Sequence, residues 1–199
     1  MAFLTTFACQ YAPRRWTSLS RVWFAVFALM LTGRSDLPAQ TTTSPEYQIK
    51  AVFLFNFAQF VEWPTNAFAG AESPLIIGVL GDDPFGAYLD EIVRGQKVNH
   101  RPLAIQRYRG LEEIKTCHLL FVSQSEKYRL DQILASLKDR NILTVGDAES
   151  FAQRGGMVRF VTEKNKIRLR INLEAATEAK LTISSKLLRP AEIVAPGKD

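Results

Sequence analysis

The pattern of residues 46–194 predicts an α/β fold, a three-layer sandwich around a mixed, mostly parallel sheet with a long N-terminal helix. Two short apolar runs, 75–80 and 118–122, are typical of strands buried on both faces. Segments with apolar residues at helical spacing alternate with these runs. Residues 157–171 have the pattern of an antiparallel hairpin, which we place at the edge of the sheet.

The first predicted element is a helix at 46–63, which begins after Ser44-Pro45 and stops before Pro64. A strand at 75–80 follows, and it leads into a short helix at 84–93. The next expected elements are strands at 103–108, 118–122 and 142–145, and an amphipathic helix at 128–137.

The C-terminal part begins with the hairpin, whose strands 157–162 and 167–171 are joined around residues 163–166. Asn172 is then expected to cap a helix at 173–179, and a helical turn is expected at 184–188.

The first forty residues have the pattern of an export signal. Arg14, Arg15 and Arg21 precede an apolar run at 22–31, which is shorter than the roughly 20 residues that cross a bilayer. Small residues end the segment at Ala39. We therefore predict a signal peptide at 1–39 and an exported protein, with an uncleaved anchor as the alternative. A linker at 40–45, the domain at 46–194 and a tail at 195–199 would follow.

Composition narrows the class of protein. With 47% hydrophobic and 23% charged residues among 199, the chain is globular rather than disordered. Most of the net charge of +5 lies in the predicted signal, because residues 40–199 hold 21 basic and 19 acidic side chains, a net charge of +2. A nucleic-acid partner is therefore not expected. Cys9 lies in the signal, so Cys117 has no partner for an internal disulfide.

The first helix carries more apolar side chains than one buried face needs. On a helical wheel, Lys50 falls within the apolar stripe, whereas Val52, Phe55 and Trp63 fall among polar residues. Lys50 either extends its amine past the helix end or is buried beside a carboxylate. The three apolar side chains are either covered by another part of the chain or form a docking surface.

The turn after the first strand is a candidate ligand cleft, because ligands of open α/β sheets gather at the carboxyl ends of strands. Asp82, Asp83 and Phe85 lie in this turn. The glycine spacing does not match the dinucleotide motif, so no nucleotide cofactor is expected. Either an aspartate caps the following helix, or the aspartates bind an amine, a hydroxyl-rich ligand or a basic group.

No pattern indicates catalysis or a metal site. Cys117 and His118 are adjacent in a strand, so their side chains point to opposite faces and make a poor dyad. Arg168 and Arg170 share one face of the hairpin. That face is either solvated or binds an anion or an acidic partner.

Five segments of residues 46–194 stand out in order: Tyr47–Phe57 with Val61-Glu62-Trp63-Pro64; Gly81-Asp82-Asp83-Pro84-Phe85-Gly86; Cys117–Val122; Leu143-Thr144-Val145-Gly146-Asp147 with Phe151 and Gly155-Gly156; and Ile171-Asn172 with Ile183–Leu188. In this order they resemble the YfiR-like family of exported bacterial proteins, and together they cover most of residues 46–194. One departure is that better-known members carry cysteine pairs, whereas only Cys117 remains here.

The resemblance implies a periplasmic, dimer-forming regulator that restrains an inner-membrane diguanylate cyclase and lowers cyclic-di-GMP output and biofilm formation. It also implies relief by an outer-membrane, peptidoglycan-binding lipoprotein. Val52, Phe55 and Trp63 are the expected partner-binding residues, with Lys50 or the pair Arg168 and Arg170 fixing the register. The alternatives are a small-molecule sensor using Asp82, Asp83 and Phe85, and an enzyme, for which the sequence offers no set of residues.

Overall fold

The computed structural model describes residues 43–197, which belong to a compact unit beginning at Thr41. The predicted signal peptide lies outside these residues. The helices are α2 (Pro45–Phe60), α3 (Ala87–Val93), α4 (Leu130–Leu137), α5 (Leu173–Glu178) and α6 (Ser185–Leu188), with 3-10 turns η1 (Thr65–Ala67), η2 (Leu111–Glu113) and η3 (Gln124–Arg129). The strands are β1 (Val61–Glu62), β2 (Leu75–Leu80), β3 (Lys97–Val98), β4 (Arg101–Tyr108), β5 (Leu119–Val122), β6 (Leu143–Gly146), β7 (Val158–Glu163), β8 (Lys166–Ile171), β9 (Thr182–Ile183) and β10 (Glu192–Ile193).

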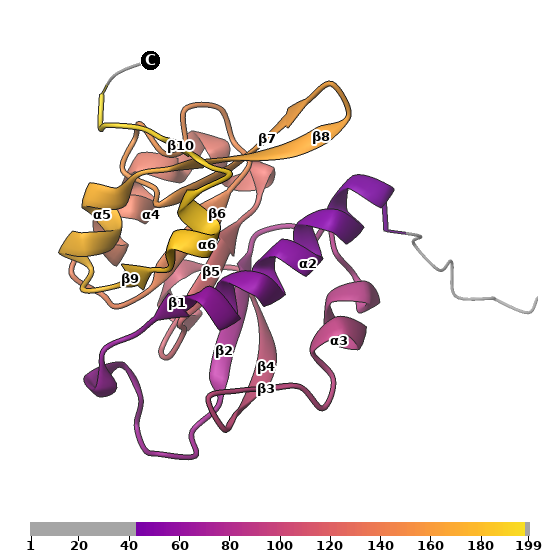
Figure 1. Ribbon diagram of the computed structural model, residues 1–199, viewed down its shortest axis with the longest axis vertical. Coiled ribbons are helices and arrows are strands. Elements are labelled where there is room, and N and C mark those ends of the chain that lie inside the picture. Colours follow the sequence, from indigo (N-terminus) through magenta and orange to yellow (C-terminus); the bar gives the residue numbers. More distant parts are fainter. Residues whose placement is uncertain (1–42, 198–199) are drawn as a thin grey trace, which may run out of the picture. The chain divides into compact units, whose positions relative to one another are not determined.

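The main sheet has eight strands in the order β10-β8-β7-β6-β5-β2-β4-β3 (Figure 1). Its five central strands, from β4 to β7, are parallel, and the β7–β8 and β3–β4 pairs are antiparallel. This arrangement confirms the predicted α/β class with a mostly parallel sheet. The hairpin β7–β8 is not at the edge, however, because β10 pairs with β8.

Two apolar cores lie on opposite faces of the sheet and make the three layers. One core joins α2 and α3 to the side chains of Ile77, Val79 and Phe121. The other joins α4 to Leu80 and Leu120, the residues that alternate with the first set. In Figure 1, α2 crosses the face that carries the first core. Within residues 43–197, no helix combines the length and hydrophobicity needed to cross a membrane.

Several element boundaries differ from the sequence predictions. The first helix stops at Phe60, because Val61 and Glu62 form β1 and pair with β9. The second helix begins at Ala87 rather than Pro84, because Gly86 has a φ of 53° and lies outside the helical region. The amphipathic helix α4 begins only after the 3-10 turn η3.

The hairpin turn is short. Lys164 and Asn165 both have positive φ, 49° and 59°, which is the geometry of a two-residue turn with the twist that antiparallel strands prefer. Asn172 caps α5 as predicted, since its side-chain oxygen accepts a hydrogen bond from the N–H of Ala175 at 3.0 Å.

Candidate functional site

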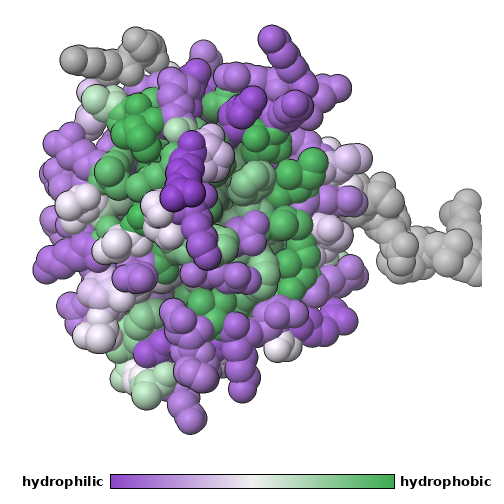
Figure 2. Space-filling view, viewed as in Figure 1, coloured by the Kyte–Doolittle hydropathy of each residue, from purple (hydrophilic) through white to green (hydrophobic). Residues whose placement is uncertain are grey.

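The outward side of α2 carries apolar side chains in solvent. Ile49 is 49% exposed and Val52 is 41% exposed. At 100° per residue, Ile49, Val52 and Phe55 fall within one broad face, together with polar residues of the same helix, whereas Trp63, which was predicted on the helix, lies beyond α2 and directly after β1. We call these four residues the α2 surface. Figure 2 views the molecule from this side and shows hydrophobic surface over α2, interrupted by polar side chains.

The two aromatic residues of the α2 surface are half-buried. Both Phe55 and Trp63 pack partly against the first core. The indole Nε1–H of Trp63 donates a hydrogen bond to the backbone oxygen of His118 at 3.0 Å. The chain therefore covers each ring in part, as one of the two interpretations predicted, and the docking interpretation stays a prediction.

Lys50 is buried and paired, as one of its two interpretations predicted. Its side chain is 3% exposed, and its Nζ lies 2.6 Å from Asp147 and 2.7 Å from Glu46. The hydroxyl of Tyr47 also donates to Asp147, at 2.9 Å. Lys50 therefore does not offer its amine to a partner, because burial directs that charge into the subunit. Instead, it fastens the N-terminal half of α2 to the end of β6.

His118 holds the loop that follows α2 and β1. Its Nδ1 accepts a hydrogen bond from the N–H of Ile76 at 3.0 Å, so the proton of the neutral ring lies on Nε2, which donates to the oxygen of Ala67 at 3.2 Å. The ring stacks on Phe68, and Arg101 lies over that same phenyl ring at 3.8 Å. Burial lowers the pKa of His118, and the charge of Arg101 acts in the same direction.

The residues of the expected strand-end cleft have mostly internal partners. Phe85 is fully buried, so it belongs to the core and does not present a ligand surface. Asp83 accepts a hydrogen bond from the N–H of Phe85 at 2.7 Å and pairs with Arg107 at 2.6 Å. Arg107 also pairs with Asp90 of α3. Asp83 thus stabilises the turn before α3 instead of capping the helix, and only Asp82 is exposed.

The arginines of the hairpin lie on the face predicted for them. Arg170 is opposite Arg159, and Arg168 is opposite Val161 in the pairing of β7 with β8. Arg168 is exposed, whereas Arg170 pairs with Glu192 of β10 at 2.9 Å. Arg168 is therefore the better placed of the two for an acidic group of another molecule.

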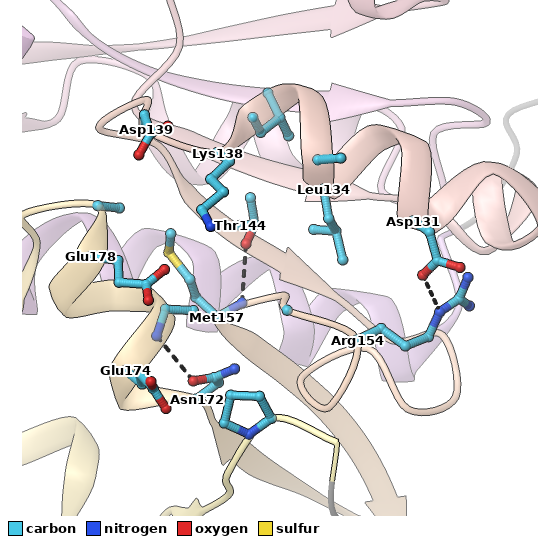
Figure 3. A pocket seen from close by; sticks show the side chains of 16 residues that line it. Asp131, Leu134, Lys138, Asp139, Thr144, Arg154, Met157, Asn172, Glu174 and Glu178 are labelled. Carbon is cyan, nitrogen blue, oxygen red and sulfur yellow. Dashed lines mark hydrogen bonds and ion pairs between the residues drawn. The ribbon is translucent and has the colours of Figure 1, made fainter.

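A pocket of about 380 Å³ lies between α4 and α5 (Figure 3). Thr144 and Asn172 line it, and each accepts a hydrogen bond from a backbone N–H at 3.0 Å. Arg154 closes one end through an ion pair with Asp131 at 2.7 Å. A second pocket, of about 630 Å³, is lined partly by Gln106 and His118. The residues expected to bind a ligand line neither pocket.

Cys117 is a core residue. It is 7% exposed, and burial raises the pKa of its thiol to about 12, so the nucleophilic thiolate is strongly disfavoured. Within residues 43–197, no three His, Cys, Asp or Glu side chains are grouped so that they could hold a metal ion.

Sequence reasoning missed two residues of this region. Asp147, the partner of Lys50, follows the predicted strand 142–145 after a single glycine, and that position at a strand end was the available signal. Ile49 was not singled out, although it is the most exposed apolar residue of α2.

Together, these features define an α/β domain with exposed apolar side chains on one helix, and with His118 and Cys117 in buried, structural positions. The YfiR/HmsC-like family model matches residues 47–192, and the chain belongs to this family. A search of curated proteins finds no match. Membership implies a periplasmic regulator of cyclic-di-GMP signalling rather than an enzyme.

Proposed function

We propose that the chain restrains an inner-membrane diguanylate cyclase by binding the cyclase's periplasmic sensor part through the α2 surface. If the chain binds the inactive state of the cyclase more tightly than the active state, binding shifts the population toward inactivity and lowers cyclic-di-GMP. Biofilm formation would fall with it. An outer-membrane, peptidoglycan-binding lipoprotein would relieve the inhibition by sequestering the chain, which we propose acts as a homodimer.

The observation that carries this proposal is the exposure of Ile49 and Val52 on a helix that is otherwise well packed. Burial of large apolar side chains by a partner removes them from water and so stabilises the complex. The accessible sides of Phe55 and Trp63 supply aromatic rings of the kind that dominate binding energy at interfaces. Arg168, which is exposed on the hairpin, supplies a positive charge that can fix the orientation of the partner.

A complementation experiment tests the proposal. In a strain that lacks the chain, cyclic-di-GMP is expected to rise, and the natural sequence is expected to return it to the starting level. Val52→Asp is expected not to restore repression, because it places a charge within the apolar contact. Tyr128→Asp is the matched control, because it also replaces an exposed apolar residue, 88% exposed in η3, with aspartate.

The folding of each variant is compared by thermal unfolding, and membranes are searched for a protein that co-purifies with the chain. Both variants are expected to remain within about 0.5 kcal/mol of the natural chain in stability. Full repression by Val52→Asp would contradict the proposal that the α2 surface binds the partner. If cyclic-di-GMP is unchanged in the deletion strain and no membrane protein co-purifies, a diguanylate cyclase is not the partner.

A further inference from the structure

The positive charge of the domain is concentrated in the hairpin β7–β8. Residues 158–171 hold five basic side chains and one acidic side chain, a net charge of +4. The other residues of 40–199 hold 16 basic and 18 acidic side chains, a net charge of −2. The hairpin is therefore a basic region on a domain that is otherwise slightly acidic, and its basic residues are Arg159, Lys164, Lys166, Arg168 and Arg170.

The register of the hairpin brings most of these charges to one face. In an antiparallel pair, residues directly opposite each other point to the same side of the sheet. Alternate residues of a strand lie about 7 Å apart, so the three cations of β8 form a row on that side. The basic face, as we call it, consists of the opposite pairs Arg159 and Arg170, Val161 and Arg168, and Glu163 and Lys166.

The basic face is directed to solvent. The other face of the hairpin packs on α2 in the first core, where Phe160 stacks on Phe57. Among the described residues, the second core, on the far side of the sheet from α2, includes none from β7 or β8. Lys166 and Arg168 are exposed, as is Lys164 in the turn. In Figure 1 the tip of the hairpin projects beyond the neighbouring strands.

Three of these cations are not neutralised within the domain. The single acid of the basic face, Glu163, lies 3.8 Å from Arg170, which also pairs with Glu192 at 2.9 Å. Within residues 43–197, no ion pair involves the side chains of Lys164, Lys166 and Arg168. Like charges held on one short ribbon repel one another, and contact with an anionic surface relieves that repulsion.

The composition of the basic face favours a lipid surface over a protein. Protein interfaces concentrate their binding energy in aromatic and large apolar residues and are depleted in lysine. The basic face holds no aromatic residue, and its single apolar residue, Val161, is partly covered. An anionic phospholipid surface needs no such residue, because each lysine or arginine near it contributes to binding.

We propose that the basic face and Lys164 bind the phosphate headgroups of anionic phospholipids, so that the hairpin holds the domain against a membrane surface. The contact is electrostatic and reversible, since this face offers only Val161 for insertion among the acyl chains. The α2 surface belongs to the other side of the sheet, so lipid contact leaves it accessible to a protein. Confinement at a membrane raises the effective concentration of the domain beside any partner in that membrane.

Lipid binding by the hairpin is independent of the cyclase proposal, because it does not involve the α2 surface. Flotation with lipid vesicles measures the binding of the protein purified from the periplasm. We expect binding to vesicles of equal parts phosphatidylglycerol and phosphatidylcholine, and none to vesicles of phosphatidylcholine alone. Binding is expected to fall steeply when salt is raised from about 0.01 to 0.15 M, because the Debye length shortens from about 30 to about 8 Å.

The test variant is Lys164→Gln with Lys166→Gln, which removes two charges without adding a negative one. It is expected to weaken binding to the anionic vesicles at least tenfold. The matched control is Lys97→Gln with Lys180→Gln. It changes the net charge equally, and like the test variant it alters one strand residue and one residue of positive φ. The control is expected to stay within about threefold of the natural chain. Arg168 is left unchanged, because the cyclase proposal also uses it.

Thermal unfolding checks that both double variants fold, and the single variants Lys166→Gln and Lys97→Gln repeat the comparison with one charge each. Three results would overturn the proposal: no binding to anionic vesicles at low salt, equal binding to neutral vesicles, or equal losses in the test variant and the control. Binding of soluble polyglutamate without binding of anionic vesicles would assign the hairpin to an acidic protein instead. Each of these results would leave the Val52→Asp experiment unaffected, so the two proposals can fail separately.

Discussion

Each of the two sides of α2 carries an exception to the usual distribution of side chains. The inner side buries a charged residue, Lys50, among the aromatic rings of Tyr47 and Phe160, whereas the outer side leaves Ile49 and Val52 in solvent. The buried charge is compensated within the subunit, because Asp147 and Glu46 both lie within 2.7 Å of it. Within residues 43–197, the side chains of Ile49 and Val52 are left largely uncovered, and the proposed partner would remove them from water.

Substitution of the inner charge is expected to have the largest effect on stability. Lys50→Met leaves the buried carboxylate of Asp147 without its cation, which typically costs about 3–5 kcal/mol. Chemical denaturation measures the loss. The double variant Lys50→Met with Asp147→Leu is expected to recover at least half of it, because a well-packed apolar pair replaces a buried ion pair at little cost. A loss below about 1 kcal/mol for Lys50→Met alone would mean that the buried pair does not fasten α2.

A substitution at the boundary between the two sides separates folding from binding. Phe55→Ser removes a half-buried ring, so we expect a loss of stability of about 1–2 kcal/mol, below the 3–5 kcal/mol typical of a fully buried phenylalanine. The loss of partner association is expected to be larger, about 2 kcal/mol or more, as for an aromatic anchor. Thermal unfolding and co-purification with membrane proteins measure the two quantities. A variant that loses stability but keeps full association refutes a docking role for this ring.

The contacts of α2 also illustrate which features of the structure could be predicted from the sequence. Apolar runs such as 75–80 and 118–122 determine strands whatever their neighbours are, and the observed strands β2 and β5 agree. The burial of Lys50 depends on Asp147, almost a hundred residues away, and no local pattern encodes that distance. The short strands β1, β3, β9 and β10 were missed for the same reason, because two residues form a strand only when a partner strand is already in place.

The candidate ligand cleft at Asp83 and Phe85 shows the same limit. A turn at a strand end is a sound position for a ligand, and the sequence shows that position. It does not show that Arg107, from a neighbouring strand, forms an ion pair with Asp83, or that the side chain of Phe85 is buried in the core. The position of a residue in the topology was therefore predictable, whereas the neighbours of its side chain were not.

Acidification tests the segment that follows α2 and β1, where Trp63 meets His118. Because burial lowers the pKa of His118 below its unfolded value of about 6.5, the folded state favours the neutral ring. The stability that this ring contributes is fully present above about pH 6.5 and is lost as the pH falls through the lower, folded pKa. His118→Gln keeps an acceptor for Ile76 and a donor for Ala67 but does not titrate, so its stability is expected to fall less between pH 7 and 5. Once residues 1–39 are removed, Trp63 is the sole tryptophan, and its fluorescence reports the same region during the titration. Equal acid sensitivity of both proteins would show that protonation of His118 does not control the attachment of this loop.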